Sequence, residues 1–236
     1  MFFYGYDWTY LVLVLPFVIL SLIASHNVNS TFDKYSKIRS QRGLTGAQAA
    51  ARVLQANGVA NVRIERISGQ LTDHFDPRTN VIRLSDNVYD SNSVAAIGVA
   101  CHEAGHAVQY AVNYGPIRLR AAIIPITNIG SKLAMPLILI GLLLEFFAEV
   151  SNIFVVLGVI CFSLSVIFQI VTLPVEFNAS RRAINAISDS YILTDDELRG
   201  AKKTLTAAAM TYVAATAVAL MQLLRLIMIF GRRRRD

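Results

Sequence analysis

Two histidines and a glutamate lie close together in the segment His102-Glu103-Ala104-Gly105-His106. On an α-helix, residues four positions apart lie on the same face, so both imidazoles point to one place. This spacing can hold a zinc ion through two nitrogen ligands at about 2.0–2.1 Å. Glu103 lies beside that face, where its carboxylate can take a proton from a metal-bound water. The HExxH pattern therefore predicts the metal-binding helix of a zinc hydrolase.

The residues before the motif favour a helix that is buried in a protein core. Ser93 suits the N-cap of a helix that runs from Val94 through the motif to Tyr110. The approach to His102 is almost entirely apolar, which is unusual for an exposed helix. A chance pattern is the alternative, but the chain has only four histidines and two of them form this motif. We therefore expect Zn²⁺ as the cofactor.

The rest of the chain has the composition of a membrane protein. Of its 236 residues, 54% are hydrophobic and 16% are charged, against about 25% charged in a typical soluble domain. Four segments are apolar enough to cross a bilayer, namely residues 10–25, 134–147, 152–173 and 207–230. A cleaved signal peptide is the alternative for the first segment. It lacks a basic leading region and a clear small-x-small cleavage site, so we expect a retained anchor with Trp8 and Tyr10 at the interface. The second is expected to begin before the membrane and to enter it at a kink at Pro125.

A polar insert separates the first and second spans. Residues 44–55 predict a helix that stops at Asn57-Gly58, and the alternation over residues 61–67 predicts a half-buried strand. A turn at residues 76–80 leads into a second strand, formed by Val81, Ile82, Arg83 and Leu84. Strand addition holds a peptide in a sequence-tolerant way, so we expect this strand to be a sheet edge that contacts substrate. The alternative is that it only packs the insert.

These patterns predict a mainly α-helical integral membrane protein with about four transmembrane helices. A small α+β insert that carries the zinc helix lies between the first and second spans. The expected parts are an N-terminal anchor (residues 1–25), the insert (26–120), a transmembrane hairpin (121–173), a segment with the third metal ligand (174–206), and a C-terminal transmembrane helix with a basic tail (207–236).

The third metal ligand must come from a carboxylate, because no histidine follows His106. A catalytic zinc site usually has three protein ligands and one open position. The downstream candidates are Glu145, Glu149, Glu176, Asp189 and the acids of residues 194–197.

Position along the chain separates these candidates. Residues 194–197 have the pattern of a helix capping box, so their acids have a structural role. Glu145 and Glu149 fall in the turn of the hairpin, across the membrane from the histidines. Glu176 follows the third span on the zinc side, and Pro174 suits the first turn of a new helix that presents it. We predict Glu176 as the ligand; the alternative is an interfacial glutamate paired with a neighbouring arginine.

The motifs together resemble a known group of enzymes. HExxH, a transmembrane hairpin and then Glu176-Phe177-x-Ala179 resemble the membrane gluzincins, which include HtpX and the CAAX prenyl proteases. The segments LTDHFDPR (residues 71–78), VIRLS (81–85) and PVEFNASRRA (174–183) look like the YugP-type zinc metallopeptidases of bacterial membranes. This resemblance covers nearly the whole chain. It implies a zinc peptidase with His102, His106 and Glu176 as ligands and Glu103 as general base.

Asn178 is the main departure from that family pattern, which usually has Asp at this position. A carboxylate beside a ligating imidazole orients the ring and raises its basicity. Asparagine can accept the same hydrogen bond without the charge. We therefore expect metal binding to persist at this centre.

The predicted function is a membrane-embedded zinc endopeptidase that hydrolyses peptide bonds near the membrane surface. Glu103 would assist the attack of a zinc-bound water and return the proton to the leaving amine. Arg181, Arg182 and His74 are candidate donors to the oxyanion. A non-catalytic zinc-containing scaffold or adaptor is the alternative, and Asn178 favours it. The presence of Glu103 favours the enzyme, because a structural site needs no base.

The distribution of basic residues favours an active site on the cytoplasmic face of the cell membrane in a multi-pass protein. The zinc side carries Lys34, Lys37, Arg39, Arg42, Arg118, Arg120, Arg181, Arg182, Arg199, Lys202 and Lys203 near membrane ends. Residues 232–235 are four arginines on the opposite side, which argues against this orientation. Such a run beside a span is typical of an anchor in anionic headgroups. The expected partners are peptides or membrane proteins as substrates, the bilayer, and other membrane proteins in a complex, with no nucleic acid.

Overall fold

The computed structural model describes residues 8–144 and 148–232, and the chain divides into two compact units. Unit 1 comprises Met1–Ile23, Leu119–Thr172 and Tyr212–Asp236. Unit 2 comprises Ala24–Arg118 and Leu173–Thr211, and contains the HExxH segment. Each unit is described by itself below.

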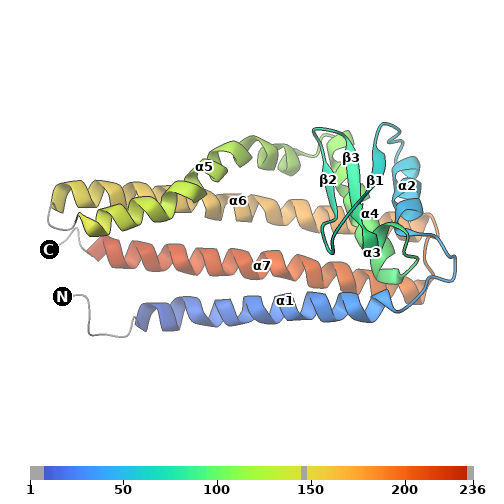
Figure 1. Cartoon of the computed structure of the whole chain (residues 1–236), viewed down its shortest axis with the longest axis horizontal. Helices are drawn as coiled ribbons and strands as arrows, with labels where there is room; N and C mark the ends of the chain where they lie inside the picture. The colour runs from blue at the N-terminus through green and yellow to red at the C-terminus, as the bar shows by residue number, and fades with distance from the viewer. Residues whose placement is uncertain (1–7, 145–147, 233–236) are drawn as a thin grey trace. The chain divides into compact units, whose positions relative to one another are not determined.

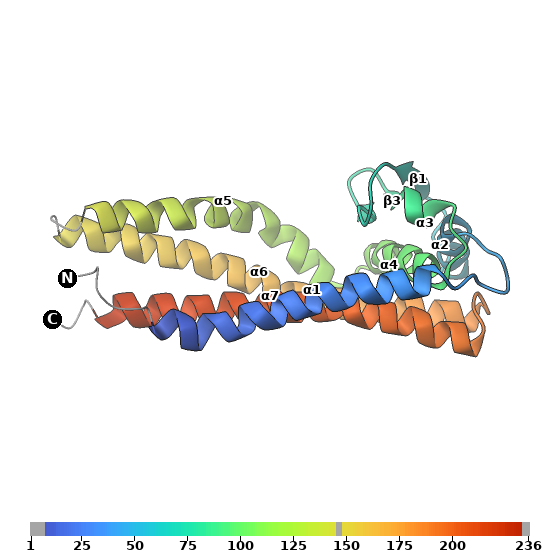
Figure 2. The ribbon, with the colours of Figure 1, turned by 60° about the horizontal axis from the view of Figure 1, so that its bottom comes forward.

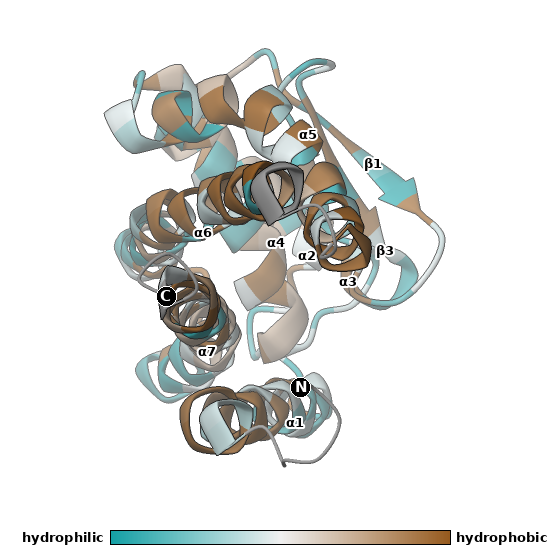
Figure 3. Cartoon of the chain, turned by 90° about the vertical axis from the view of Figure 1, so that its left-hand side faces the viewer, coloured by the Kyte–Doolittle hydropathy of each residue, from teal (hydrophilic) through white to brown (hydrophobic). Residues whose placement is uncertain are grey.

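Among the residues that the structure describes, four helices are long and apolar enough to cross a membrane, which confirms the predicted fold class. A π-helical turn at Tyr10–Val14 leads into α1 (Leu15–Ser36), and the other three are α5 (Gly115–Leu143), α6 (Ala148–Asp189) and α7 (Asp195–Arg232). Figure 3 shows hydrophobic residues dominating these helices. Within unit 1, the guanidinium of Arg225 lies 5.5 Å from the ring centre of Tyr10.

The prolines inside these helices do not end them. α5 begins at Gly115, before its apolar run as predicted, and contains Pro125 and Pro136. Figure 1 shows it bending along its length. Pro174 was expected to start a new helical segment, and that prediction is wrong: α6 continues through it.

The stripe of side chains after Pro174 explains why α6 continues. Val175, Ala179, Ala183 and Ile187 recur every four residues and are fully buried. The free energy gained by burying this stripe exceeds the cost of the one intrahelical hydrogen bond that a proline removes. The third span and the segment that carries Glu176 are therefore parts of one helix.

A three-stranded sheet lies in unit 2, with the strand order β1-β3-β2. The strands are β1 (Arg63–Ile67), β2 (His74–Asp76) and β3 (Val81–Ser85). β3 pairs in parallel with β1, from Arg63 opposite Val81 to Ile67 opposite Ser85, and antiparallel with β2, with Phe75 opposite Ile82. Figure 1 shows the three strands beside α2 and α4.

The prediction that residues 81–84 form an edge strand is wrong, because β3 is the central strand. The segment before the predicted turn, for which no strand was predicted, forms β2 and covers the side that was expected to be open. The turn itself is present: the Thr79 hydroxyl and the Arg78 amide donate to Asp76, and these bonds hold the pKa of Asp76 at about 2. The edge strands of this sheet are β1 and β2.

Two capped helices complete the insert. In α2 (Gly46–Ala56), Thr45 and Gln48 form a reciprocal capping box. In α4 (Val94–Ala111), the Ser93 side chain accepts from the amide of Ala96, as predicted. The short helix α3 (Asp86–Tyr89) links β3 to α4.

One apolar core joins these elements within unit 2. It includes Val53 of α2, Leu84 of β3, Ile97 of α4, Ile187 of α6 and Leu205 of α7. Complete burial of such a side chain contributes about 1.5–3 kcal/mol. The core therefore fixes α4 against the segment of α6 that follows Pro174.

Candidate metal centre

His102 and His106 lie one turn apart on α4, on the same face of the helix. Their ring centres are 4.7 Å apart and the rings are nearly perpendicular, at 84°. The helix is buried along most of its length, and His106 is 9% exposed. Both rings therefore meet within the protein, as the spacing predicted.

Glu176 of α6 completes a cluster with these two histidines. Its Oε2 lies 3.4 Å from Nε2 of His102 and 3.6 Å from Nε2 of His106. Tetrahedral zinc with bonds of about 2.0–2.1 Å separates its ligand atoms by about 3.3 Å. The three side chains offer one ligand atom each within 4.8 Å of one another, so they are positioned to bind a metal ion. This is the donor set that was predicted.

Gly105 allows α6 to approach α4 this closely. A Cβ atom at position 105 would lie 2.6 Å from the carbonyl oxygen of Ala179, which is far inside van der Waals contact. Because Gly105 has no side chain, the backbones of α4 and α6 can touch at this point. α4 carries His102 and His106, and α6 carries Glu176. The glycine inside the motif thus positions the third donor.

Gln109, one turn beyond His106, fixes how that imidazole is presented. Its side-chain nitrogen donates to the Val175 carbonyl at 2.8 Å and to Oδ1 of Asn178 at 3.0 Å. Its oxygen must therefore accept from Nδ1 of His106, at 3.0 Å. With the proton on Nδ1, Nε2 of His106 presents its lone pair toward Glu176. Gln109 is completely buried, so water does not compete for these bonds.

His102 has a different partner on α6. Its Nδ1 lies 3.1 Å from the Ser180 hydroxyl, which can accept the proton of that nitrogen. Ser180 follows Glu176 by one helical turn. The same face of α6 therefore supplies both a donor atom and the support for a histidine.

Asn178 does not contact a ligating imidazole in the structure, contrary to our expectation. Its Oδ1 accepts from Nε2 of Gln109 and, at 2.8 Å, from Nε of Arg182. Asn178 thus acts on His106 through Gln109. The sequence suggested that residue 178 contacts an imidazole directly, but Gln109 lies between them. The missing carboxylate charge is therefore further from the metal centre than expected.

Glu103 lies next to His102 on α4 and is 8% exposed. Burial lowers the pKa of His106, but the carboxylate of Glu176, 3.6 Å from its Nε2, and the charge of Glu103 raise it more. The pKa of His106 therefore lies above its ordinary value. Because metals bind the neutral ring, protons and metal compete for this imidazole.

The remaining predicted residues lie outside the cluster. Arg181 is exposed, and Arg182 is held by Asn178. His74 lies on β2, exposed, with Nδ1 2.8 Å from the Thr72 carbonyl oxygen. His74 was predicted as one of three candidate donors to the oxyanion, and its partner here is a backbone carbonyl of the loop before β2.

Of the other carboxylates that were considered, those that the structure describes are not part of the centre. Glu197 accepts from the amides of Thr194 and Gln41, so it has the structural role that the capping pattern predicted. Glu145 and the side chain of Glu149 lie outside the described residues. The same holds for residues 233–235 of the arginine run and for the side chain of Arg232.

Gln109 and Ser180 were not predicted as site residues. Both follow a predicted metal ligand by one helical turn, Gln109 after His106 and Ser180 after Glu176, and so share its face. That spacing was a usable signal, because metal-ligating histidines almost always donate their second ring nitrogen to a partner.

A helix-borne HExxH pair with a carboxylate from a second helix defines the donor set of a zinc metallopeptidase. The comparisons agree with this class. The chain belongs to the family described as "putative neutral zinc metallopeptidase", whose model matches residues 10–231. It is 47% identical over 211 residues to the "Putative membrane protease YugP" of Bacillus subtilis (strain 168). The aligned residues cover 89% of this chain and 92% of the relative. No solved structure matches this chain.

Proposed function

We propose that this protein is an integral-membrane zinc endopeptidase of the gluzincin type. His102, His106 and Glu176 would hold Zn²⁺, with Glu103 as general base. The observation that carries the proposal is the convergence of the three ligand atoms from α4 and α6 beside Glu103. Three protein donors leave one tetrahedral position for water or substrate, as in catalytic rather than structural zinc sites.

When bound, zinc supplies a Lewis acid that polarises a carbonyl group and lowers the pKa of water toward about 7. Glu103 takes the proton from the attacking water and later gives it to the departing amine. Gln109 and Ser180, which contact Nδ1 of the two imidazoles, would leave both Nε2 atoms free to bind the ion. Arg181, Arg182 and His74 are the proposed donors to the oxyanion.

Peptide substrates follow from the family and from the membrane protease that the chain resembles. A peptide that adds to the sheet would pair with β1 or β2, because β3 already has a neighbour on both sides. β2 is the nearer candidate, since it contacts α4. Residues 81–84 of β3 would then pair with β2 and would not contact the substrate strand directly.

We also propose that the centre faces the cytoplasm. The basic residues of unit 2 near the ends of the apolar runs support this orientation. Lys37→Cys would place a thiol on an exposed position of unit 2. A membrane-impermeant maleimide should label it in inverted vesicles and not in intact cells, and the reverse pattern would place the centre outside.

The ligand assignment is tested with full-length protein purified in detergent. Wild type should hold about one zinc per chain, whereas His106→Ala and Glu176→Ala should hold almost none. Asp189→Asn changes another carboxylate of α6 and is the matched control, which should keep its zinc. Casein cleavage by the wild type should stop with a zinc chelator and return with added zinc. Zinc retention by Glu176→Ala would refute the proposed ligand set.

A further inference from the structure

A second polar feature of unit 2 lies between α1 and α7 and has no part in the proposed catalysis. The two helices are side by side (Figures 1 and 2), and a groove of about 610 Å³ separates their side chains. A Cβ on Gly200 would lie 2.7 Å from Cδ1 of Tyr35, so the helices touch at one place along the groove. The groove volume is within the range of about 300–1,000 Å³ that is usual for small-molecule sites.

The groove is strongly basic. Lys34 of α1 and Arg199, Lys202 and Lys203 of α7 line it, and no acidic side chain does. Arg199 pairs with Asp196, but within the described ranges no carboxylate pairs with Lys34, Lys202 or Lys203. Like charges around one hollow repel one another unless an anion lies between them. The groove therefore suits a negatively charged ligand.

Helical spacing gathers these charges on single faces. Arg199, Lys202 and Lys203 are followed at the same spacing by Thr206 and Met210, which also line the groove. Lys34 follows Thr31 by one turn on α1 in the same way. Towards its apolar run, α7 thus presents three cations, a hydroxyl and then an apolar side chain, and α1 presents one cation and one hydroxyl.

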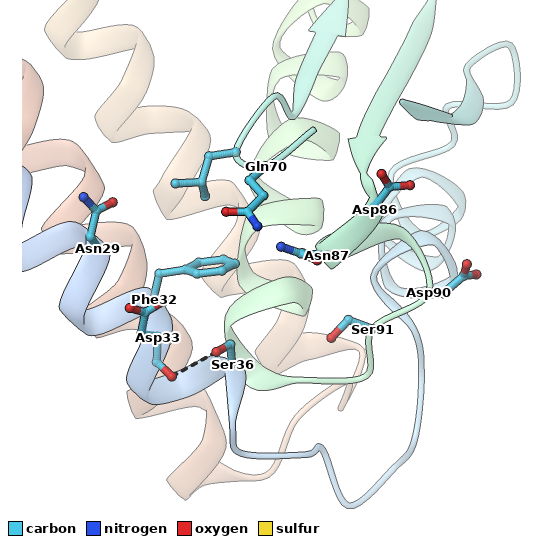
Figure 4. Close-up of a pocket in the computed structure, with 10 residues that line it drawn as sticks. Asn29, Phe32, Asp33, Ser36, Gln70, Asp86, Asn87, Asp90 and Ser91 are labelled. Carbon is cyan, nitrogen blue, oxygen red and sulfur yellow. Dashed lines mark hydrogen bonds between the residues drawn. The ribbon is translucent and has the colours of Figure 1, made fainter. Parts of the chain in front are cut away.

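Another face of α1 near the same end carries an acidic side chain, Asp33. Asn29 and Asp33 line a separate cavity of about 800 Å³ with Asp86 and Asp90 (Figure 4). The last two are already paired with Arg66, at 2.6 and 2.9 Å. Lys34 and Asp33 of α1 therefore line different cavities. The basic groove is a local arrangement rather than a general excess of positive charge.

The position of the groove along the chain indicates what kind of anion it meets. On α7, Lys202 and Lys203 directly precede the apolar run that begins near Ala207. On α1, Thr31 and Lys34 lie six and nine residues after the apolar run that ends near Ser25. Both helices are candidate membrane spans, so these residues fall where lipid headgroups lie. Met210 would lie at the start of the acyl-chain region.

We propose that the α1–α7 groove binds the phosphate headgroup of an anionic phospholipid. The four cations contact the phosphate oxygens, the hydroxyls of Thr31 and Thr206 donate to them, and Met210 packs on the first part of an acyl chain. Such a bound lipid holds the ends of α1 and α7 together beside the catalytic unit.

The test uses full-length protein in detergent, titrated with short-chain phosphatidylglycerol and with phosphatidylcholine while thermal stability is followed. Wild type should be stabilised by phosphatidylglycerol and not by phosphatidylcholine. Lys202→Gln with Lys203→Gln should lower the affinity for phosphatidylglycerol by tenfold or more, at about fivefold per charge. Lys37→Gln with Arg42→Gln removes the same charge from unit 2 outside the groove and should change it less than about twofold.

Three outcomes would overturn the proposal. An equal loss in both double variants would mean general attraction between the basic surface and anionic lipid. Equal stabilisation by phosphatidylcholine would remove the role of headgroup charge. Inorganic phosphate that binds as tightly as phosphatidylglycerol and competes with it would identify a soluble phosphate as the ligand. The zinc content of each variant reports whether unit 2 is folded.

Discussion

The metal centre and the α1–α7 groove lie in the same unit, and each is formed by two helices that are far apart in sequence. They differ in how their polar groups are held. At the centre, Glu176 and His106 are buried and the ring nitrogens meet fixed partners. In the groove, the lysines are exposed and no carboxylate among the described residues pairs with them.

This difference separates a preorganised site from an adaptable one. A small ion with strict geometry needs donors that are fixed before it binds, and the protein fixes them through helix contact and buried hydrogen bonds. A lipid headgroup needs charge at roughly the right place, because long side chains can follow it. Single substitutions should therefore have large effects at the centre and small ones in the groove.

The largest effect is expected where the two helices touch. Gly105→Ala forces a Cβ against the Ala179 carbonyl, and overpacking of this kind costs about 1–3 kcal/mol or more. Separation of α4 from α6 should also abolish zinc binding, because Glu176 moves away with α6. Thermal unfolding and zinc content measure the two effects.

Gly98→Ala is the matched control on the same helix. Its Cβ would lie 3.4 Å from Cβ of Ala201, an ordinary contact, so both stability and zinc should be nearly unchanged. Equal zinc loss in the two variants would mean that close approach at Gly105 has no special role.

An intermediate effect is expected for the partners of the two imidazoles. Gln109→Leu removes the acceptor of His106 and should weaken zinc affinity about 10–100-fold. Ser180→Ala removes a half-buried partner of His102 that water can replace, so its effect should be below about tenfold. Competition with a zinc chelator of known affinity ranks the variants. A stronger effect of Ser180→Ala would reverse our view of which histidine is more firmly held.

A single groove cation should have a smaller effect, which disappears at high salt. Lys34→Gln should lower phosphatidylglycerol affinity about fivefold. Between about 0.1 M and 1 M salt the screening length falls from about 10 Å to about 3 Å, so the lipid preference should largely vanish. Zinc retention should not change over that range. Zinc retention that falls with salt, or a lipid preference that persists at high salt, would contradict the proposed difference between the two sites.

The smallest effect is expected at Asn178. Asn178→Asp keeps the acceptor for Gln109 and Arg182, and does not contact a metal-binding ring. Zinc affinity should therefore stay within about threefold of wild type, well below the loss at a direct partner. The chelator competition used for Gln109 measures it, and a gain of tenfold or more would show that the missing charge matters to the centre.

Local signals in the sequence predicted much of this molecule. The four apolar runs, the Thr45 and Ser93 caps and the one-turn spacing of His102 and His106 depend on neighbouring residues only. Glu176 was predicted from its place after an even number of expected crossings, together with the absence of a later histidine. The structure brings it to the histidines.

Features that depend on tertiary packing were not predicted. β2 is short and has no clear alternation, and only its pairing with β3 reveals it as a strand. α6 passes Pro174 because of a buried stripe whose partners lie in other elements. The Gln109 and Asn178 network joins residues far apart in sequence, so no local pattern contains it.

The most direct test of the central claim compares wild type with Glu103→Gln, both full-length and in detergent. Each is assayed for zinc by elemental analysis and for cleavage of casein. We predict about one zinc per chain in both proteins and cleavage by the wild type alone, because Glu103 serves as base and not as ligand. Equal cleavage by the variant, or loss of its zinc, would contradict the role of Glu103. Zinc in both with no cleavage of any substrate would contradict the proposed peptidase.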